Sequence, residues 1–107
     1  MGVRIHPDAD EEMNALPVEE RAALRHAIEK LEAMGLALAF PHTSNVQTAR
    51  SLRELRPRAG ASAWRGFYRR IGDDFVVGAI GPDANSDPHG FAKAVVVAEE
   101  RLDAITP

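Results

Sequence analysis

The apolar positions between Pro17 and Met34 recur every three or four residues along the chain. This spacing places them on one side of an α-helix, so it predicts a helix over 17–34 with one buried face. The positions are Leu24, Ala27, Ile28, Leu31 and Met34. Gly35 follows directly and suits the end of a helix, because glycine readily adopts the left-handed backbone conformation found there.

Two other stretches combine a helical pattern with a start signal. Pro7 can occupy the first position of a short helix, and the acids that follow it favour a helix N-terminus. The apolar side of that helix carries Ala9, Met13 and Leu16. Near the other end of the sequence, Asp87 and Pro88 predict the start of a helix whose apolar stripe runs from Phe91 to Ile105.

The remaining apolar stretches are typical of strands. Val3 to Ile5 is long enough only for an edge strand, whereas 52–56, 64–71 and 75–80 are longer and are bounded by turn residues. The last of these is apolar at every position, which predicts a central strand covered on both faces. The stretch 36–50 shows no period and is expected to be a loop.

Alternation along 64–71 predicts two different faces. One face carries Trp64, Gly66, Tyr68 and Arg70, and the other carries Arg65, Phe67, Arg69 and Ile71. The loop over 36–50 is long for a compact domain, so either Leu36, Leu38 and Phe40 pack it against the surface or it has a functional role. Together the elements predict an α+β fold: a small, mostly antiparallel sheet of about four strands, packed by an N-terminal helix pair and a C-terminal helix.

Length and composition limit the possible classes of protein. The chain of 107 residues, with 45% hydrophobic residues, is expected to form a single domain over 1–107. It has no cysteine, so disulfides and thiolate metal sites are excluded. The longest apolar run is much shorter than the roughly 18 residues of a membrane span, and no secretion signal is visible, so a cytoplasmic protein is expected. No motif for a metal or a cofactor was found, and none is expected.

Charge is distributed unevenly along the chain. The net charge is −3, yet residues 35–70 contain seven arginines and one acid, Glu54. Arginine is always charged and binds phosphate oxygens in a forked geometry, so several arginines interleaved with aromatic residues indicate an RNA or phosphate site. The same arginines could instead pair with the acids of the helices. Composition alone leaves both interpretations open.

The order of these elements, together with three motifs, resembles a known family. The motifs are Leu52-Arg-Glu-Leu-Arg56, Trp64-Arg-Gly-Phe-Tyr-Arg69 and Ala98-Glu-Glu-Arg-Leu102. The chain resembles the RelE/ParE superfamily of toxins from type II toxin-antitoxin systems, in particular the HigB-like, phage-derived branch. The resemblance implies ribosome-dependent endoribonuclease activity on mRNA, inhibition of translation, no metal, and a cognate antitoxin as partner.

The implied chemistry assigns expected roles to residues. The ribose 2′-hydroxyl attacks the adjacent phosphate, so the site must move protons and stabilise negative charge. Arg56 and Arg65 match the basic positions of the family and are expected at the phosphate, with Arg69 as a further candidate. Proton-transfer candidates are His42, Glu54, Tyr68 and His89, although a structural role is favoured for Glu54 and Tyr68. Additional RNA contacts are expected from Arg53, Arg58, Arg70 and Trp64.

One segment departs from the family pattern. Relatives carry a phenylalanine and paired lysines after the apolar strand, whereas this chain has the acidic segment Gly81 to Asp87. Two alternatives to the ribonuclease therefore stay open. One is a RelE-fold protein with weak or lost catalysis that binds a protein partner, and the other is a gyrase inhibitor of the ParE kind.

Overall fold

A computed structural model describes residues 2–105 of the chain. The helices are α1 (Pro7–Asn14), α2 (Val18–Met34) and α3 (Pro88–Asp103), and two short 3-10 turns are η1 (Gly35–Ala37) and η2 (Pro57–Gly60). The strands are β1 (Val3–Ile5), β2 (Thr43–Asn45), β3 (Arg53–Leu55), β4 (Trp64–Ile71) and β5 (Asp74–Pro82). No helix within residues 2–105 is long and apolar enough to cross a membrane.

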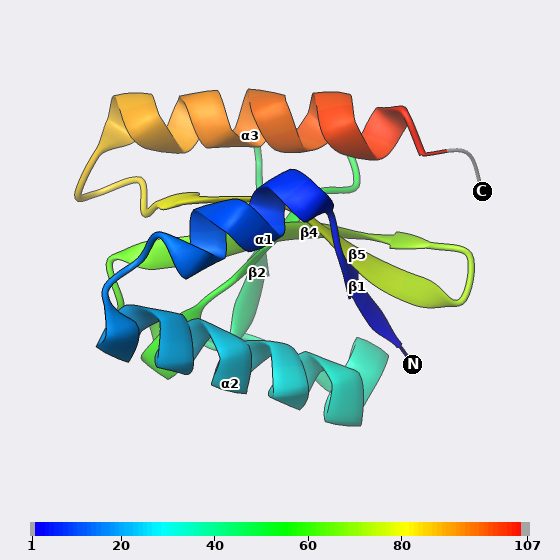
Figure 1. Cartoon of the computed structure of the whole chain (residues 1–107). Coiled ribbons are helices and arrows are strands. Elements are labelled where there is room, and N and C mark those ends of the chain that lie inside the picture. Colours follow the sequence, from blue (N-terminus) through cyan, green and yellow to red (C-terminus); the bar gives the residue numbers. More distant parts are fainter. Residues whose placement is uncertain (1, 106–107) are drawn as a thin grey trace.

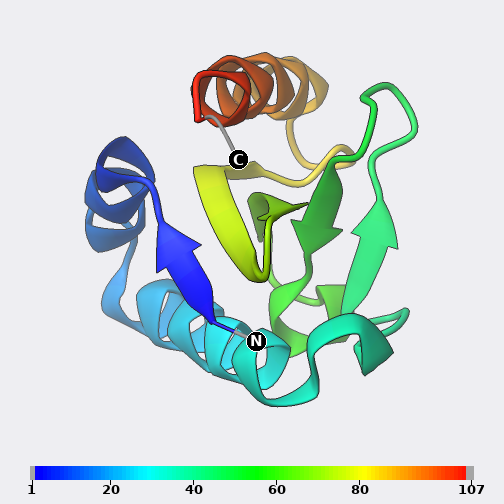
Figure 2. The same cartoon turned by 90° about the vertical axis from the view of Figure 1, so that its right-hand side faces the viewer.

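Within the described part of the chain, the strands form one five-stranded sheet in the order β1-β5-β4-β3-β2. Strand β1 runs parallel to β5, and the other neighbouring pairs are antiparallel. Helix α3 covers one face of the sheet, while α2 covers the other and α1 lies beside β1 and α2 (Figures 1 and 2). The expected α+β class and helix arrangement are therefore confirmed.

The expected number of strands was too low. Strand β2 lies inside the stretch 36–50 that was expected to be a loop. Its residues are polar, and it is held by pairing with β3, so that Ser44 lies opposite Glu54. Of the three apolar residues expected to pack this stretch, Leu38 is buried, whereas Leu36 and Phe40 are exposed.

The helix starts follow the sequence signals. Pro7 is the first residue of α1, and the ring nitrogen Nδ1 of His6 accepts a hydrogen bond from the backbone N–H of Asp8 at 3.1 Å. At the start of α3, the carboxylate of Asp87 accepts a hydrogen bond from the N–H of Gly90 at 2.9 Å. Both contacts satisfy backbone donors that have no partner inside the first turn of a helix.

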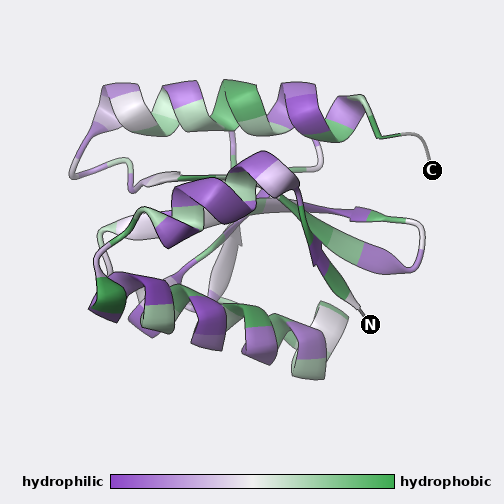
Figure 3. Ribbon diagram, in the orientation of Figure 1, coloured by the Kyte–Doolittle hydropathy of each residue, from purple (hydrophilic) through white to green (hydrophobic). Residues whose placement is uncertain are grey.

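Two hydrophobic cores lie on opposite faces of the sheet. Hydropathy colouring shows hydrophilic and hydrophobic positions alternating along the helices (Figure 3). The core on the α1 and α2 side contains Met13, Leu24, Leu31, Leu55, Tyr68 and Val77. The core on the α3 side contains Leu52, Phe67, Val76, Ala98 and Leu102. Tyr68 and Phe67 thus point to opposite faces, as the alternation along β4 predicted.

A β-bulge in β5 brings α3 close to the sheet. Phe67 pairs with Ala79 and Tyr68 pairs with Val77, so Gly78 is the extra residue between them. A Cβ atom at Gly78 would lie 2.7 Å from Cγ of Leu102 on α3. Glycine at this bulge therefore allows the helix to approach the strand backbone closely.

Candidate functional site

A polar pocket opens where β3 and β4 meet the start of α3. It has a volume of about 410 Å³. Its wall on the sheet side is formed by Glu54, Arg56 and Arg65, together with the connection Gly60 to Ser62. The opposite wall includes Asp83, Ser86 and Phe91. The structure therefore brings together three of the residues expected from the sequence to act in catalysis.

Glu54 is the centre of the contacts in this pocket. Its side chain is 12% exposed, and its Oε1 atom accepts hydrogen bonds from Ser44 Oγ at 2.9 Å and from Arg56 Nη1 at 3.0 Å. Its other oxygen, Oε2, lies 3.9 Å from Nε of Arg65. The Glu54 carboxylate therefore lies between two guanidinium groups.

Arg56 lies at the rim of the pocket. Its side chain is 21% exposed, its Nε donates to the carbonyl oxygen of Pro41 at 3.0 Å, and its guanidinium stacks 5.2 Å from the centre of the Phe40 ring. A Cβ atom at Gly60 would collide with Nη2 of Arg56. Gly60, with a φ of 96°, therefore leaves the space in which this guanidinium sits.

Arg65 is buried behind Arg56 and is 5% exposed. Its Nη1 donates to the carbonyl oxygens of Ser62 at 2.6 Å and Trp64 at 2.9 Å, and Nη2 donates to that of Gly60 at 3.4 Å. Burial lowers the pKa of the guanidinium from its usual value, and the neighbouring Glu54 carboxylate opposes this shift. Arg65 thus holds the connection between β3 and β4 while placing positive charge behind the pocket.

The acidic segment Gly81 to Asp87 begins with the last two residues of β5 and continues as a compact turn beside these arginines. Oδ1 of Asp83 accepts hydrogen bonds from the N–H groups of Asn85 at 2.8 Å and Ser86 at 2.9 Å, and Oδ2 accepts from Ser86 Oγ at 2.7 Å. The Ser86 hydroxyl is the main cause that holds the pKa of the Asp83 carboxyl below its usual value. Within residues 2–105, no group of three or more histidine and acidic side chains is arranged to hold a metal ion.

Tyr68 and Arg53 belong to a separate cluster on the α2 face of the sheet. Tyr68 is 2% exposed, and its hydroxyl lies 2.6 Å from Oγ1 of Thr43. Nε of Arg53 donates to the same Thr43 oxygen at 3.3 Å, and Nη1 donates to Asn45 Oδ1 at 2.6 Å. These two residues connect β2, β3 and β4, away from the polar pocket.

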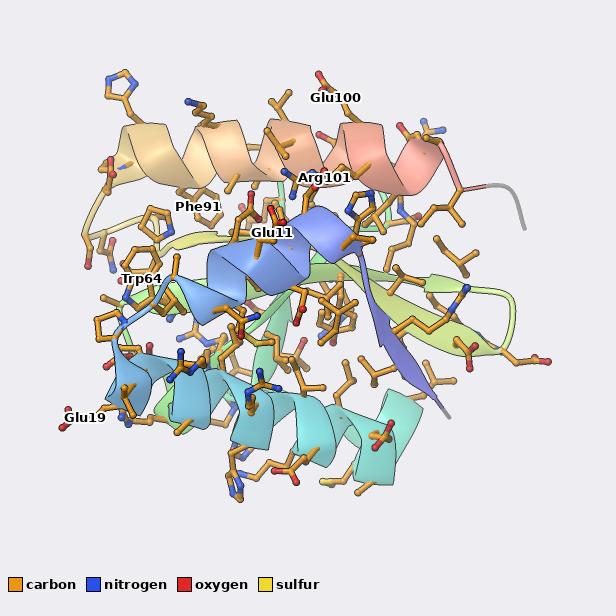
Figure 4. All side chains as sticks on the ribbon, in the orientation of Figure 1. Glu11, Glu19, Trp64, Phe91, Glu100 and Arg101 are labelled. Carbon is orange, nitrogen blue, oxygen red and sulfur yellow. The ribbon has the colours of Figure 1, made fainter. Side chains whose placement is uncertain are left out.

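The other residues expected to act in catalysis or to contact RNA are dispersed. Arg58 donates to Glu20 at 2.8 Å, Arg69 to Asp103 at 2.6 Å, and Arg70 to the carbonyl oxygen of Gly72 at 3.0 Å. Trp64 packs against the core on the α1 and α2 side (Figure 4). His42 lies half-buried in a neighbouring groove that also contains Arg56, and His89 is exposed on α3.

Sequence reasoning missed two serines, Ser62 in the lining of the polar pocket and Ser44, which bonds to Glu54. Ser44 was not considered because β2 was not expected, and only the pairing of β2 with β3 brings it to Glu54. Ser62 was also missed, although it accepts a hydrogen bond from the N–H of Trp64 at 3.1 Å and donates to Glu20 at 2.6 Å. A serine two residues before a strand was the available signal, because its hydroxyl can bond nearby backbone groups.

Comparisons with known proteins place these observations in context. The family model for phage derived protein Gp49-like matches residues 11–78. No curated protein matches the chain. Among solved structures, the chain is similar to the E. coli toxin RelE in the free state, in a mutant with two arginines replaced by alanine. The identity is 15%, the match covers 89% of this chain and 94% of that one, and the TM-score is 0.59.

Proposed function

The chain belongs to the phage-derived Gp49-like family, a RelE/HigB-like family of toxins, and we propose that it is a toxin that cleaves mRNA on the ribosome. The observation that carries this proposal is the Glu54–Arg56 pair at the rim of the polar pocket, with the buried cation of Arg65 behind it. The pair offers a carboxylate and a guanidinium 3.0 Å apart. A cognate antitoxin is the expected partner.

The proposed reaction needs one attack and two proton transfers. The ribose 2′-oxygen forms a bond to phosphorus, the bond from phosphorus to the 5′-oxygen breaks, and a 2′,3′-cyclic phosphate remains. Glu54 accepts the proton of the 2′-hydroxyl. Arg56 stabilises the extra negative charge on the phosphate oxygens, because its guanidinium keeps its own proton. The leaving 5′-oxygen takes a proton, and His42, which lines the neighbouring groove together with Arg56, is its proposed donor.

Substitutions of the pair test this proposal. In a translation system with purified ribosomes, Arg56→Ala is expected to slow mRNA cleavage by about 10²- to 10³-fold. Glu54→Gln, which keeps the shape of the side chain, is expected to slow it by about 10²- to 10⁴-fold. Arg25→Ala is the matched control, because Arg25 is exposed on α2 and outside the pocket.

The same variants also distinguish the ribonuclease from a gyrase inhibitor. Growth arrest that depends on Arg56 and Glu54, with cleaved mRNA, supports the ribonuclease. Cleavage that both variants retain rules out this site. DNA damage with intact translation indicates a gyrase inhibitor instead.

A non-catalytic protein-binding role is a second candidate. It is favoured by the carboxylate of Asp83, which lies in the pocket where additional positive charge would help an RNA phosphate. In that case the wild-type protein does not cleave mRNA on ribosomes and does not arrest growth. Both outcomes are measured in the same assay.

A further inference from the structure

The connection between β3 and β4 contains three consecutive residues with a positive φ. Arg58 has φ 55° and ψ 39°, Ala59 has φ 54° and ψ 32°, and Gly60 has φ 96°. Glycine adopts a positive φ readily, but in arginine and alanine the Cβ atom makes this conformation unfavourable. Two such residues in a row persist only where the contacts around them hold the backbone. We refer to Arg58 to Gly60 as the left-handed turn.

Glu20 of α2 binds the first residue of this turn and a residue just beyond its end. Its Oε2 atom accepts a hydrogen bond from Nη1 of Arg58 at 2.8 Å, and its Oε1 atom accepts one from Oγ of Ser62 at 2.6 Å. The same Ser62 oxygen accepts from the N–H of Trp64, the first residue of β4, at 3.1 Å. The Glu20 side chain is 23% exposed, so its contacts are partly shielded from water. One carboxylate on α2 therefore spans the left-handed turn.

The same stretch of backbone lies against the two arginines of the polar pocket. The carbonyl oxygens of Gly60 and Ser62 accept hydrogen bonds from Arg65, at 3.4 and 2.6 Å. A Cβ atom at Gly60 would collide with Nη2 of Arg56, so this guanidinium lies directly against the turn. Glu20 itself is not among the residues that line the pocket, so it does not contact a ligand there. The left-handed turn thus connects Glu20 to both pocket arginines.

We propose that Glu20 is a positioning residue for the polar pocket, because it holds the left-handed turn in the conformation that places the guanidinium groups of Arg65 and Arg56. Without the carboxylate, Arg58 and Ala59 relax toward negative φ, and the carbonyl oxygens of this stretch move away from Arg65. The positioning is argued from the contacts of the turn. Its effect on catalysis rests on the proposed ribonuclease function.

The positioning is measured by NMR without any substrate. The coupling between the amide and Hα protons of Ala59 reports its φ angle. The exchange rate of the Nε–H proton of Arg65 reports its burial, because within residues 2–105 this buried nitrogen has no hydrogen-bond partner that would slow exchange. Glu20→Ala is expected to move φ of Ala59 toward negative values and to speed exchange of the Arg65 proton by at least about tenfold. Glu32→Ala removes an exposed carboxylate from the same helix and is expected to change neither.

Cleavage of mRNA on ribosomes measures the effect on the reaction. At a temperature where the variant is fully folded, Glu20→Ala is expected to lower kcat by about 10- to 100-fold and to leave KM within about twofold, because a displaced Arg56 weakens mainly the stabilisation of the transition state. Glu20→Gln keeps one acceptor oxygen and is expected to fall between wild type and Glu20→Ala. Ile28→Ala removes a partly buried side chain from the same helix, outside the pocket lining, so it lowers the stability of the fold and is expected to keep the wild-type kcat.

A second substitution in the turn separates positioning from a general loss of stability. Ala59→Gly makes a positive φ accessible at this residue without the Glu20 contacts. Ala59 is exposed, so the loss of its methyl group removes no core contact. Alone, Ala59→Gly is expected to change kcat by less than about twofold, whereas in combination with Glu20→Ala it is expected to raise kcat by at least about threefold over Glu20→Ala.

Each outcome supports or overturns a part of the proposal. If Glu20→Ala leaves φ of Ala59 and the exchange of the Arg65 proton unchanged, the positioning is overturned. If the turn changes but kcat does not, or if Ile28→Ala loses as much kcat, the effect on catalysis is overturned. Failure of Ala59→Gly to raise the kcat of Glu20→Ala overturns the left-handed turn as the link to the pocket. If the wild type does not cleave mRNA, the proposed function fails, while the NMR measurements still decide the positioning.

Discussion

The Nη1 atom of Arg65 lies 2.6 Å from the carbonyl oxygen of Ser62, and Arg65 as a whole is 5% exposed. A guanidinium in this position acts as a fixed part of the protein interior. It satisfies carbonyl oxygens of the chain between β3 and β4, and it leaves the more exposed Arg56 as the arginine that a ligand in the pocket can reach first. We therefore expect substitution of Arg65 to reduce mainly the stability of the fold, and substitution of Arg56 to reduce mainly the activity.

Arg65→Ala is expected to reduce the free energy of unfolding by about 3–5 kcal/mol, because it leaves buried carbonyl groups without their donor and removes a buried charge from beside Glu54. Arg56→Ala is expected to cost about 1–2 kcal/mol, since its side chain is partly solvated. Urea denaturation of both variants measures the difference. Equal losses in the two variants would contradict the structural role of Arg65.

Tyr68→Phe is expected to destabilise the fold by about 1–2 kcal/mol, because it removes the buried hydrogen bond to Thr43. Cleavage of mRNA should remain close to wild type, since Tyr68 lies in the cluster away from the polar pocket. Thermal unfolding and the ribosome assay measure the two effects. A large loss of cleavage at unchanged stability would instead place Tyr68 in the chemistry.

Glu20 predicts a pH dependence of stability. The hydrogen bond from Ser62, and to a smaller extent the one from Arg58, holds the pKa of its carboxyl below the usual value. A carboxyl with a lowered pKa in the folded state stabilises the fold above its unfolded pKa of about 4.3, and this stabilisation is lost as the pH falls.

The difference in melting temperature between wild type and Glu20→Gln should therefore be largest near neutral pH and should shrink below about pH 4. Calorimetry between acid and neutral pH measures it. Glu32→Gln, an exposed carboxylate on the same helix, controls for the change in charge. A difference in melting temperature that stays constant from acid to neutral pH would show that the contribution of the Glu20 contacts does not depend on the ionisation of its carboxyl.

Gly81→Ala is expected to cost about 1–3 kcal/mol, because a Cβ atom there would collide with the Cβ of Ala94 and push α3 away from β5. Gly66→Ala is the matched control. A Cβ at Gly66 would make ordinary contacts of 3.5 Å or more with Leu24, Ile80 and Leu55. Chemical denaturation measures the loss of unfolding free energy in both variants. Similar losses would mean that α3 can move away from β5 without loss of stability.

The regular helices and the longest strands could be predicted because their own residues encode them. Helix α2 was expected over 17–34 and spans Val18–Met34, and the alternation along β4 correctly separated Phe67 from Tyr68. In both elements the periodic burial of apolar side chains fixes which face meets the core.

Strand β2 and the arrangement of the pocket could not be predicted in the same way. Thr43 to Asn45 carry no apolar pattern, and their strand conformation depends on the backbone of β3 beside them. The sequence gives no sign that Arg65 is buried while Arg70 on the same strand is exposed. That difference arises because the chain between β3 and β4 folds over one guanidinium and presents its carbonyl oxygens to it.

The position of β1 also sets an order for folding during synthesis. Val3 pairs with Phe75, so the first strand to be made finds its neighbour only after most of the chain has followed. Until then its backbone donors and acceptors lack their partner strand, and contacts so distant in sequence form late. The hairpin from β4 to β5 is local by comparison and can form earlier. In a nascent chain, the arginine-bearing strand β4 can therefore pair with β5 before β1 adds to the edge of the sheet.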